Sequence, residues 1–289
     1  MAERKVLVCG AGLMGNGIGQ VMAAAGHHVR LYEPEVARAE AGRARIGASL
    51  ERAVSRGKIT EDDRRQQLGR ISVATSLPDA ARDAELIVEA VFEDEGVKRE
   101  LFTQVTAAAA VDAVLASNTS SISITRLAAV LPPDRRARFV GMHFFSPVPA
   151  MPLIELIRGA ETDDATEAYV RDLAAELGKQ VIVSRDRPGF IVNRIVMPFL
   201  GEAMRAYEEG LGTAEDIDTG ARVGLNHPMG PLELADFIGL DVVLHIMEVL
   251  HEGFGAPHHA PPPVLRQLVD AGHLGQKSGR GFYTYPRAT

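Results

Sequence analysis

The sequence predicts an α/β fold in which a mainly parallel sheet is followed by a second, all-helical domain. Short apolar runs alternate with helical patterns through the first part of the chain, and only helical patterns come after it. Strands separated by helices form βαβ units, whose sheet is parallel and covered by helices on both faces. The pattern changes near Asp186, so we expect domains at residues 1–186 and 187–289.

The expected elements follow from apolar periodicity and from glycine and proline punctuation. Strands are expected at residues 6–9, 29–32, 71–74, 86–90, 114–116, 139–142, 153–156 and 181–183. Helices of the first domain are expected at residues 16–25 and 36–56, and Thr60 begins another with the pattern of a capping box. Helices of the second domain are expected at residues 190–209, 214–223, 231–252 and 263–271.

Charge and cysteine content exclude some classes of protein. The net charge of -7 argues against a nucleic-acid-binding protein, which normally carries a basic surface. The single cysteine, Cys9, lies in an apolar run and is expected to be a buried strand residue. One cysteine fits a reducing compartment, and neither a signal segment nor a membrane-spanning run is evident. We therefore expect a cytoplasmic protein that does not associate with membranes.

A glycine-rich turn follows the first expected strand. Gly10 permits a sharp turn, Gly12 lacks a Cβ where a pyrophosphate would approach, and Gly15 lets the next helix pack closely. Such a triplet also occurs in purely structural turns. Here a strand precedes it, a helix follows, and Glu33 ends the second strand, which together predict a dinucleotide site. A carboxylate at Glu33 would bind ribose hydroxyls and repel a 2′-phosphate, so NAD is expected rather than NADP.

Further motifs extend over almost the whole chain. They are GAGLMGNGIG at 10–19, SNTSS at 117–121, MHFFSPVP at 142–149, PGFIVNR at 188–194, DIDT at 216–219, PMGP at 228–231 and GRGFY at 279–283. In these motifs and their order the chain resembles the L-3-hydroxyacyl-CoA dehydrogenase family, including bacterial 3-hydroxybutyryl-CoA dehydrogenases. The resemblance implies a Rossmann-like N-terminal domain, a helical C-terminal domain for substrate binding and dimerisation, an acyl-CoA substrate and a homodimer. It also implies a step of fatty-acid metabolism such as β-oxidation.

The resemblance assigns the catalytic residues motif by motif. His143 corresponds to the family's catalytic histidine and Glu155 to its carboxylate partner, while Ser120 and Asn193 correspond to residues that contact the substrate oxygen. A histidine and a carboxylate suit the oxidation of an alcohol. Oxidation of a secondary alcohol needs a base with a pKa near neutrality, and a carboxylate orients the imidazole and stabilises the imidazolium. Each residue also has a structural interpretation. His143 could be a structural histidine at a strand end, and Glu155 could be a buried acid that is paired elsewhere. Ser120 could cap a helix, and Asn193 could satisfy backbone groups.

Other motif positions are assigned to ligand binding in the same way. The implied cofactor residues are Gly10, Gly12, Leu13, Met14, Gly15, Glu33, Glu93, Lys98, Ser120 and Ser146. The implied substrate residues are Ser49, Arg56, Ser120 and Asn193. Ser146 departs from the asparagine usual in the family, which puts cofactor affinity or substrate range in doubt. The cations of residues 36–58 could pair with coenzyme A phosphates or form a solvated helix face.

Two other functions stay open from sequence. A related dehydrogenase of a free hydroxy acid or sugar acid would share the glycine turn and the His–Glu pair, and a non-catalytic NAD-binding module would share the turn alone. No metal is expected. His245, His251, His258 and His259 match none of the usual zinc spacings and are expected to be solvated.

Overall fold

The computed structural model describes residues 3–286 and divides the chain into two compact units, Met1–Arg187 and Pro188–Thr289. The boundary expected at residue 186 lies beside this division.

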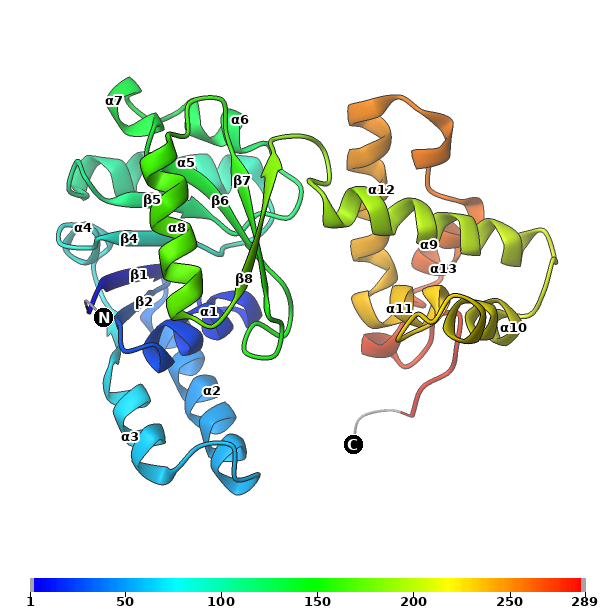
Figure 1. Cartoon of the computed structure of the whole chain (residues 1–289), viewed down its shortest axis with the longest axis horizontal. Helices are drawn as coiled ribbons and strands as arrows, with labels where there is room; N and C mark the ends of the chain where they lie inside the picture. The colour runs from blue at the N-terminus through cyan, green and yellow to red at the C-terminus, as the bar shows by residue number, and fades with distance from the viewer. Residues whose placement is uncertain (1–2, 287–289) are drawn as a thin grey trace. The chain divides into compact units, whose positions relative to one another are not determined.

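The first unit is built on one eight-stranded sheet with the order β3-β2-β1-β4-β5-β6-β7-β8 (Figure 1). Its strands are β1 (Lys5–Cys9), β2 (His28–Tyr32), β3 (Ile71–Ala74), β4 (Leu86–Glu89), β5 (Val114–Ser117), β6 (Phe139–Phe144), β7 (Leu153–Arg158) and β8 (Gln180–Arg185). Strands β1 to β6 are mutually parallel, and β7 pairs antiparallel with β6. Every expected strand is confirmed, and the sheet is mainly parallel as predicted.

Helices cover both faces of this sheet. They are α1 (Leu13–Ala24), α2 (Val36–Ser55), α3 (Glu61–Gly69), α4 (Leu77–Ala81), α5 (Glu95–Ala108), α6 (Ile124–Ala128), α7 (Pro133–Arg136) and α8 (Asp164–Glu176). Alternate strand residues face opposite sides. Val6 and Val8 belong to one core with Ile18 of α1 and Val170 of α8. On the other side Phe102 of α5 meets Phe139 edge-to-face at a ring distance of 4.8 Å.

Helices α2 and α3 form a hairpin that extends from the sheet (Figure 1). The predicted capping box is confirmed, because the Thr60 hydroxyl accepts from the Asp63 amide and the Asp63 carboxylate accepts from the Thr60 amide. Reciprocal bonds of this kind satisfy amide groups that the first helical turn leaves unpaired. The second helix of the hairpin therefore begins at a defined residue.

The second unit is helical, as predicted. Its elements are α9 (Val192–Glu208), α10 (Ala214–Thr219), the π-helix η1 (Gly220–Gly224), α11 (Pro231–Ile238), α12 (Leu240–Phe254), the 3₁₀ turn η2 (Pro257–His259), α13 (Pro263–Asp270) and the 3₁₀ turn η3 (Gln276–Ser278). Leu200, Leu232, Val243 and Leu265 lie in its apolar core. Nowhere in residues 3–286 is a helix long and apolar enough to cross a membrane.

Two boundaries of the helical unit differ from prediction. The single helix expected at residues 231–252 is two helices, because Gly239 adopts φ 102° between α11 and α12. The helix expected to start at Phe190 starts at Val192, because Phe190 has φ 51° and Gly189 has φ 73°. Apolar periodicity continues across both places, so it does not reveal the positive φ angles that interrupt the helix.

The carboxyl ends of β1, β2, β4, β5 and β6 lie at one edge of the sheet, because these strands are parallel. In the sheet, β2 lies next to β1 on one side, and β4 lies next to β1 on the other side. In open α/β sheets, ligands bind beside the carboxyl ends of strands at such a switch in strand order. The carboxyl edge between β1 and β4 is therefore the expected location of a site.

Candidate active site

The glycine turn follows β1 at this switch point. Gly10 has φ 105°, and a Cβ on it would lie 2.3 Å from the carbonyl oxygen of Ala90. A Cβ on Gly15 would lie 1.8 Å from the carbonyl oxygen of Gly10. Neither position has room for a side chain, so the sharp turn and the close helix packing predicted for these glycines are confirmed.

Gly12 is different, because a Cβ built there has no heavy atom of the described residues within 4 Å. Gly12 caps α1, and no side chain in the described part of the chain caps this helix end. Amides at a helix N-terminus together with the helix dipole attract phosphates. Leu13 and Met14, the first residues of α1, therefore offer backbone donors beside open space. These features fit a dinucleotide pyrophosphate.

Glu33 lies beside the same turn. Its Oε1 accepts a hydrogen bond from the Ala11 amide at 2.6 Å. The bond holds the carboxylate at the carboxyl end of β2, which is where the dinucleotide-binding fold carries an acidic residue. Arg45 of α2 donates to the Ala11 carbonyl at 2.8 Å and fixes the turn from the other side. The turn is thus held in shape by the protein itself.

His143 and Glu155 form a buried pair in the same unit. They are aligned partners of β6 and β7, and His143 Nδ1 lies 3.0 Å from Glu155 Oε2. The His143 residue is 7% exposed and Glu155 is fully buried. A carboxylate accepts from Nδ1–H, so this contact favours the tautomer that carries its proton on Nδ1. The Phe145 ring lies 4.5 Å from the imidazole and limits its movement.

Glu93, Lys98 and Ser120 come together after β4 and β5. Glu93 accepts from the Ser120 amide at 2.8 Å, and its other oxygen lies 3.1 Å from the Lys98 ammonium. Helix α6 is capped by Ser123 and not by Ser120, so the capping interpretation of Ser120 is wrong. Sequence reasoning missed Glu89, a fully buried acid at the end of β4 that lies 2.6 Å from the Lys98 ammonium.

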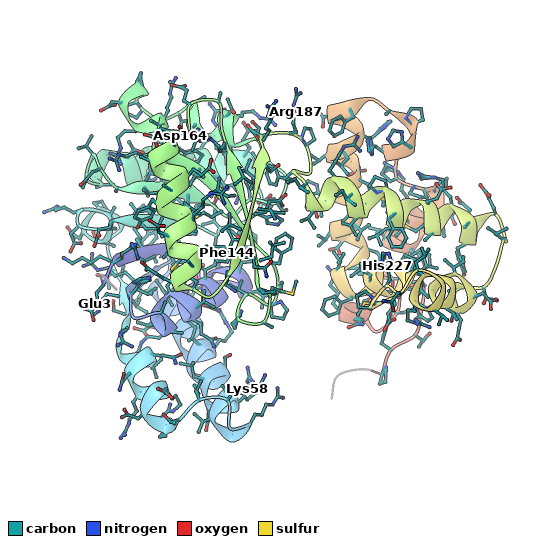
Figure 2. The ribbon with its side chains drawn as sticks, viewed as in Figure 1. Glu3, Lys58, Phe144, Asp164, Arg187 and His227 are labelled. Carbon is teal, nitrogen blue, oxygen red and sulfur yellow. The ribbon has the colours of Figure 1, made fainter. Side chains whose placement is uncertain are left out.

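The other assigned residues lie in three different places. Ser146 follows β6 and is exposed. Ser49 and Arg56 line a groove of about 620 Å³ between α1, α2 and the end of α8, with Arg52 and Lys58. Figure 2 labels Lys58, at the tip of the α2–α3 hairpin. Asn193 is buried in the first turn of α9. It belongs to the helical unit.

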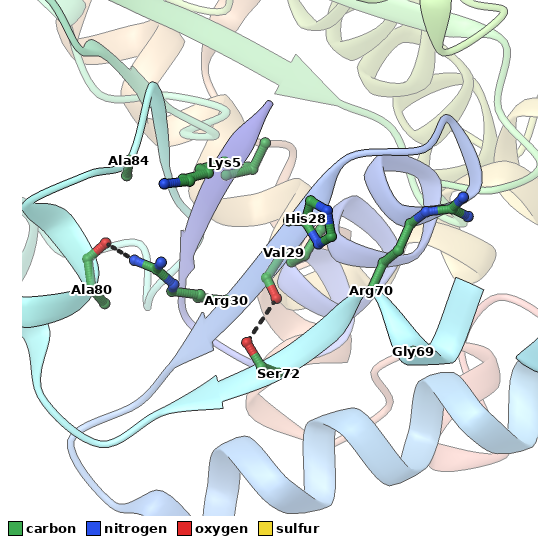
Figure 3. Close-up of a pocket in the computed structure, with 10 residues that line it drawn as sticks. Lys5, His28, Val29, Arg30, Gly69, Arg70, Ser72, Ala80 and Ala84 are labelled. Carbon is green, nitrogen blue, oxygen red and sulfur yellow. Dashed lines mark hydrogen bonds between the residues drawn. The ribbon is translucent and has the colours of Figure 1, made fainter. Parts of the chain in front are cut away.

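A second groove, of about 430 Å³, lies at the opposite edge of the sheet (Figure 3). Lys5 and His28, the first residues of β1 and β2, line it together with Arg30. The charges of Lys5 and Arg30 are already paired with Asp83. The amino ends of the strands carry none of the assigned residues, so this groove is not the candidate active site.

One expectation about the histidines is wrong. His259 was expected to be solvated but is buried, with Arg194 Nη1 2.6 Å from its Nε2. The Phe254 ring lies 5.2 Å from the imidazole. Among residues 3–286 no cluster of three or more His, Cys, Asp or Glu side chains is arranged to hold a metal ion. His259 is a packing residue of the helical unit.

A doubly wound sheet with a glycine turn at the switch point, an acid after β2 and a buried His–Glu pair defines the class of nicotinamide-dependent dehydrogenases. Comparison with known proteins identifies the family. Residues 5–187 match the NAD binding domain of 3-hydroxyacyl-CoA dehydrogenase, and residues 189–285 match its C-terminal domain. The chain belongs to the 3-hydroxyacyl-CoA dehydrogenase family, and its cofactor is NAD.

Individual relatives agree over the whole chain. A 3-hydroxybutyryl-CoA dehydrogenase of Bradyrhizobium diazoefficiens is 51% identical over 98% of this chain and 95% of its own length. The crystal structure of Mycobacterium tuberculosis FadB2 has a TM-score of 0.95 at 49% identity, covering 99% of this chain and 100% of that chain. The structure of (S)-3-hydroxybutyryl-CoA dehydrogenase PaaH1 from Ralstonia eutropha has a TM-score of 0.95 at 45% identity, with the same coverage.

Proposed function

We propose that this protein interconverts L-3-hydroxyacyl-CoA and 3-ketoacyl-CoA with NAD, and that 3-hydroxybutyryl-CoA is its substrate. The observation that carries the proposal is the buried His143–Glu155 pair, with Nδ1 and Oε2 3.0 Å apart. It lies in the unit that also carries the glycine turn and matches the NAD binding domain. Similar proteins named 3-hydroxybutyryl-CoA dehydrogenase support the choice of substrate.

In this proposal His143 moves the proton. Bound NAD would supply the acceptor for the hydride of the carbinol carbon. His143 Nε2 takes the hydroxyl proton, and the negative charge of Glu155 stabilises the imidazolium that forms. In the reverse direction the imidazolium returns the proton to the developing alkoxide. Since Glu155 is fully buried, little water screens its effect on the imidazole.

Ser120 and Asn193 would bind the oxygen whose charge changes. A hydroxyl and an amide donor stabilise a developing alkoxide more strongly than the starting alcohol. The five bonds that Glu93 accepts from the segment Thr119–Ser121 restrict the Ser120 loop. The role of Asn193 rests on the family resemblance of the PGFIVNR motif.

The cofactor would be held by the residues that frame the switch point. Backbone amides of Leu13, Met14 and Gly15 would bind the pyrophosphate, with Gly10 and Gly12 shaping the turn. Glu33 would accept from the adenosine ribose, and Glu93 and Lys98 would lie near a ribose of the cofactor. Ser146 would lie on the nicotinamide side, with a shorter side chain than the asparagine usual in the family.

The coenzyme A moiety would bind along α2. The groove of about 620 Å³ is lined by Ser49 and by the cations of Arg52, Arg56 and Lys58. Cationic side chains and hydroxyls are the usual partners of phosphate groups. This concentration of cations on a chain with a net charge of -7 supports an anionic ligand.

We further propose a cytoplasmic homodimer joined through the helical unit, acting in a step of the kind used in β-oxidation. That unit exposes several large apolar side chains: Ile195, Leu211, Val223, Leu225 and Phe237. Large exposed apolar side chains often mark protein interfaces. The free Cys9 thiol fits a reducing compartment.

The test is reduction of acetoacetyl-CoA by NADH, followed as loss of nicotinamide absorbance. We expect His143→Ala to lower kcat by about 10³-fold or more, because general acid–base catalysis supplies roughly 10²–10⁴-fold. NADH binding should persist. His28→Ala is the matched control, since that histidine begins β2 at the opposite edge of the sheet. Normal turnover by His143→Ala would remove His143 from the mechanism.

A substrate panel separates the alternatives. The hydroxyacyl-CoA proposal predicts turnover of thioesters and little turnover of the matching free acids. Selective oxidation of free hydroxy acids or sugar acids would instead indicate the related class of dehydrogenases. Tight NADH binding without turnover of any hydroxyacyl-CoA would indicate a non-catalytic module.

A further inference from the structure

Glu89 lies at the carboxyl end of β4, at the same edge of the sheet as the glycine turn that follows β1. Glu89 is the last residue of β4, aligned with Cys9 of β1 and Ser117 of β5. It is fully buried, in the centre of the sheet at the switch point. An ionisable group at such a place is costly unless it is paired, so its contacts show what it does there.

Each oxygen of this carboxylate has a partner. Oε1 accepts from the Lys98 ammonium at 2.6 Å and from the Val91 amide at 2.8 Å. Oε2 accepts from the Ser117 hydroxyl at 2.5 Å. Burial raises the pKa of Glu89, although the Lys98 ammonium and the Ser117 hydroxyl offset part of this effect. Both Glu89 and Lys98 are buried, and a hydrogen bond between charged groups is stronger in such a low-dielectric interior than in water.

Lys98 connects this acid to a second one. Its side chain is 1% exposed, and its ammonium lies 3.1 Å from Glu93 Oε2. Burial acts to raise the pKa of Glu93, but the Lys98 ammonium and the bonds from Thr119 and Ser120 outweigh burial and lower it. Glu93 is therefore held as a carboxylate.

The second oxygen of Glu93 holds the loop that carries Ser120. Oε1 accepts from the Thr119 hydroxyl at 2.5 Å, the Ser120 amide at 2.8 Å and the Ser121 hydroxyl at 3.0 Å. The contacts thus run in order from Glu89 to Lys98, then to Glu93, and then to this loop. Each member of this series is in contact with the next.

We propose that Glu89 is a positioning residue, whose buried carboxylate fixes the Lys98 ammonium and thereby sets Glu93 and the Ser120 loop for NAD and substrate. The inference rests on the proposed function of Glu93, Lys98 and Ser120. Without the Glu89 charge, Lys98 is a buried cation with one carboxylate neighbour. Its attraction then draws Glu93 away from the amide and hydroxyls of the loop.

The test compares Glu89→Gln with Glu89→Asp by fluorescence titration of NADH and by kinetics with acetoacetyl-CoA. Glutamine has the same shape but presents an N–H group where one oxygen must accept. We expect NADH affinity to fall about tenfold in Glu89→Gln, which corresponds to about 1.4 kcal/mol. The KM for NADH should rise more than the KM for acetoacetyl-CoA, and Glu89→Asp, which keeps the charge, should recover part of the affinity.

Thr162→Val is the control for lost stability. The Thr162 hydroxyl donates to the carbonyl of Phe139 at 2.6 Å, at the amino end of β6 and away from the cofactor edge. This variant should lower Tm without changing NADH affinity. Equal loss of NADH affinity in Thr162→Val and Glu89→Gln would overturn the proposal, and so would unchanged affinity in Glu89→Gln.

A double variant covers the case in which Glu89→Gln does not fold. Glu89→Gln combined with Lys98→Met removes both buried charges and should fold. If Glu89 acts through Lys98, the double variant binds NADH as weakly as Lys98→Met alone, whereas additive losses would contradict the proposal. NADH titration needs no acyl-CoA turnover, so failure of the proposed function and failure of this inference give different results.

Discussion

At the scale of single residues, the glycine turn shows that one residue type serves two different purposes. Gly10 and Gly15 are required by the protein itself, since a Cβ on either would overlap backbone atoms. Gly12 has open space around it, so the fold alone does not require glycine there. A position that the fold leaves free but the motif fixes is best explained by a ligand that approaches the backbone.

Alanine at Gly12 should therefore affect NADH binding, whereas alanine at Gly15 should affect stability. Gly12→Ala should keep the wild-type Tm and weaken NADH binding by at least about tenfold, or about 1.4 kcal/mol. Gly15→Ala should lose about 3 kcal/mol of stability, because the methyl group overlaps a carbonyl oxygen. Thermal unfolding and NADH titration of both variants distinguish the two roles. Unchanged NADH affinity in Gly12→Ala would show that the pyrophosphate does not approach this residue.

At the scale of elements, two buried acids fasten the end of the helical unit. Asp236 of α11 accepts from the amides of Phe282 and Tyr283 at 3.0 and 2.9 Å. Asp218 accepts from the amide of Leu232 at 2.8 Å and from the hydroxyl of Tyr283 at 2.8 Å. The GRGFY motif is therefore explained by attachment of the last segment to α10 and α11.

This attachment needs a glycine. A Cβ on Gly281 would lie 1.9 Å from Asp236 Oδ1, whose position is fixed by its bond to the Phe282 amide. Gly281→Ala should cost about 2–3 kcal/mol of stability through overpacking. Gly220→Ala is the matched control in the same unit, since no heavy atom of the described chain lies within 4 Å of a Cβ there. Equal free energies of urea unfolding for the two variants would contradict this account.

His259 links three elements and makes the helical unit sensitive to acid. Burial lowers its pKa, and the Arg194 cation lowers it further. The folded state therefore prefers the neutral imidazole, which accepts from Arg194. As pH falls below the unfolded value of about 6.5, the unfolded chain binds the proton first and stability declines.

The prediction is a difference in slope between wild type and His259→Gln. Between pH 7.5 and 5.5 the free energy of unfolding of wild type should fall more steeply, by at most about 1.4 kcal/mol per pH unit from this one group. Urea unfolding across that range measures both slopes. Parallel slopes would show that protonation of His259 does not contribute.

At the scale of the whole molecule, the sequence predicted both domains and each strand because apolar periodicity and glycine punctuation are local signals. Its motifs also identified His143 and Glu155 as candidate site residues. Glu89 was missed because an acid after an apolar run resembles a solvated strand end, and its partner Lys98 is reached only in three dimensions. Burial of His259 was missed for the same reason, since Arg194 lies 65 residues away.

A prediction about the oligomeric state of the protein also belongs to this scale. The helical unit exposes Leu211 at 80% and Val223 at 79%, and large exposed apolar side chains often mark protein interfaces. We expect light scattering to give a dimer for wild type and a shift toward monomer for Leu211→Glu or Val223→Glu.

NADH affinity should be unchanged in both variants, because the proposed cofactor residues belong to the other unit. Glu202→Lys is the matched control, since it changes an exposed charge on α9 and adds no charge to an apolar position. A wild-type monomer at every concentration would contradict the homodimer. Dimers in both glutamate variants would instead place the interface elsewhere, because a buried unpaired carboxylate at the contact would cost several kcal/mol.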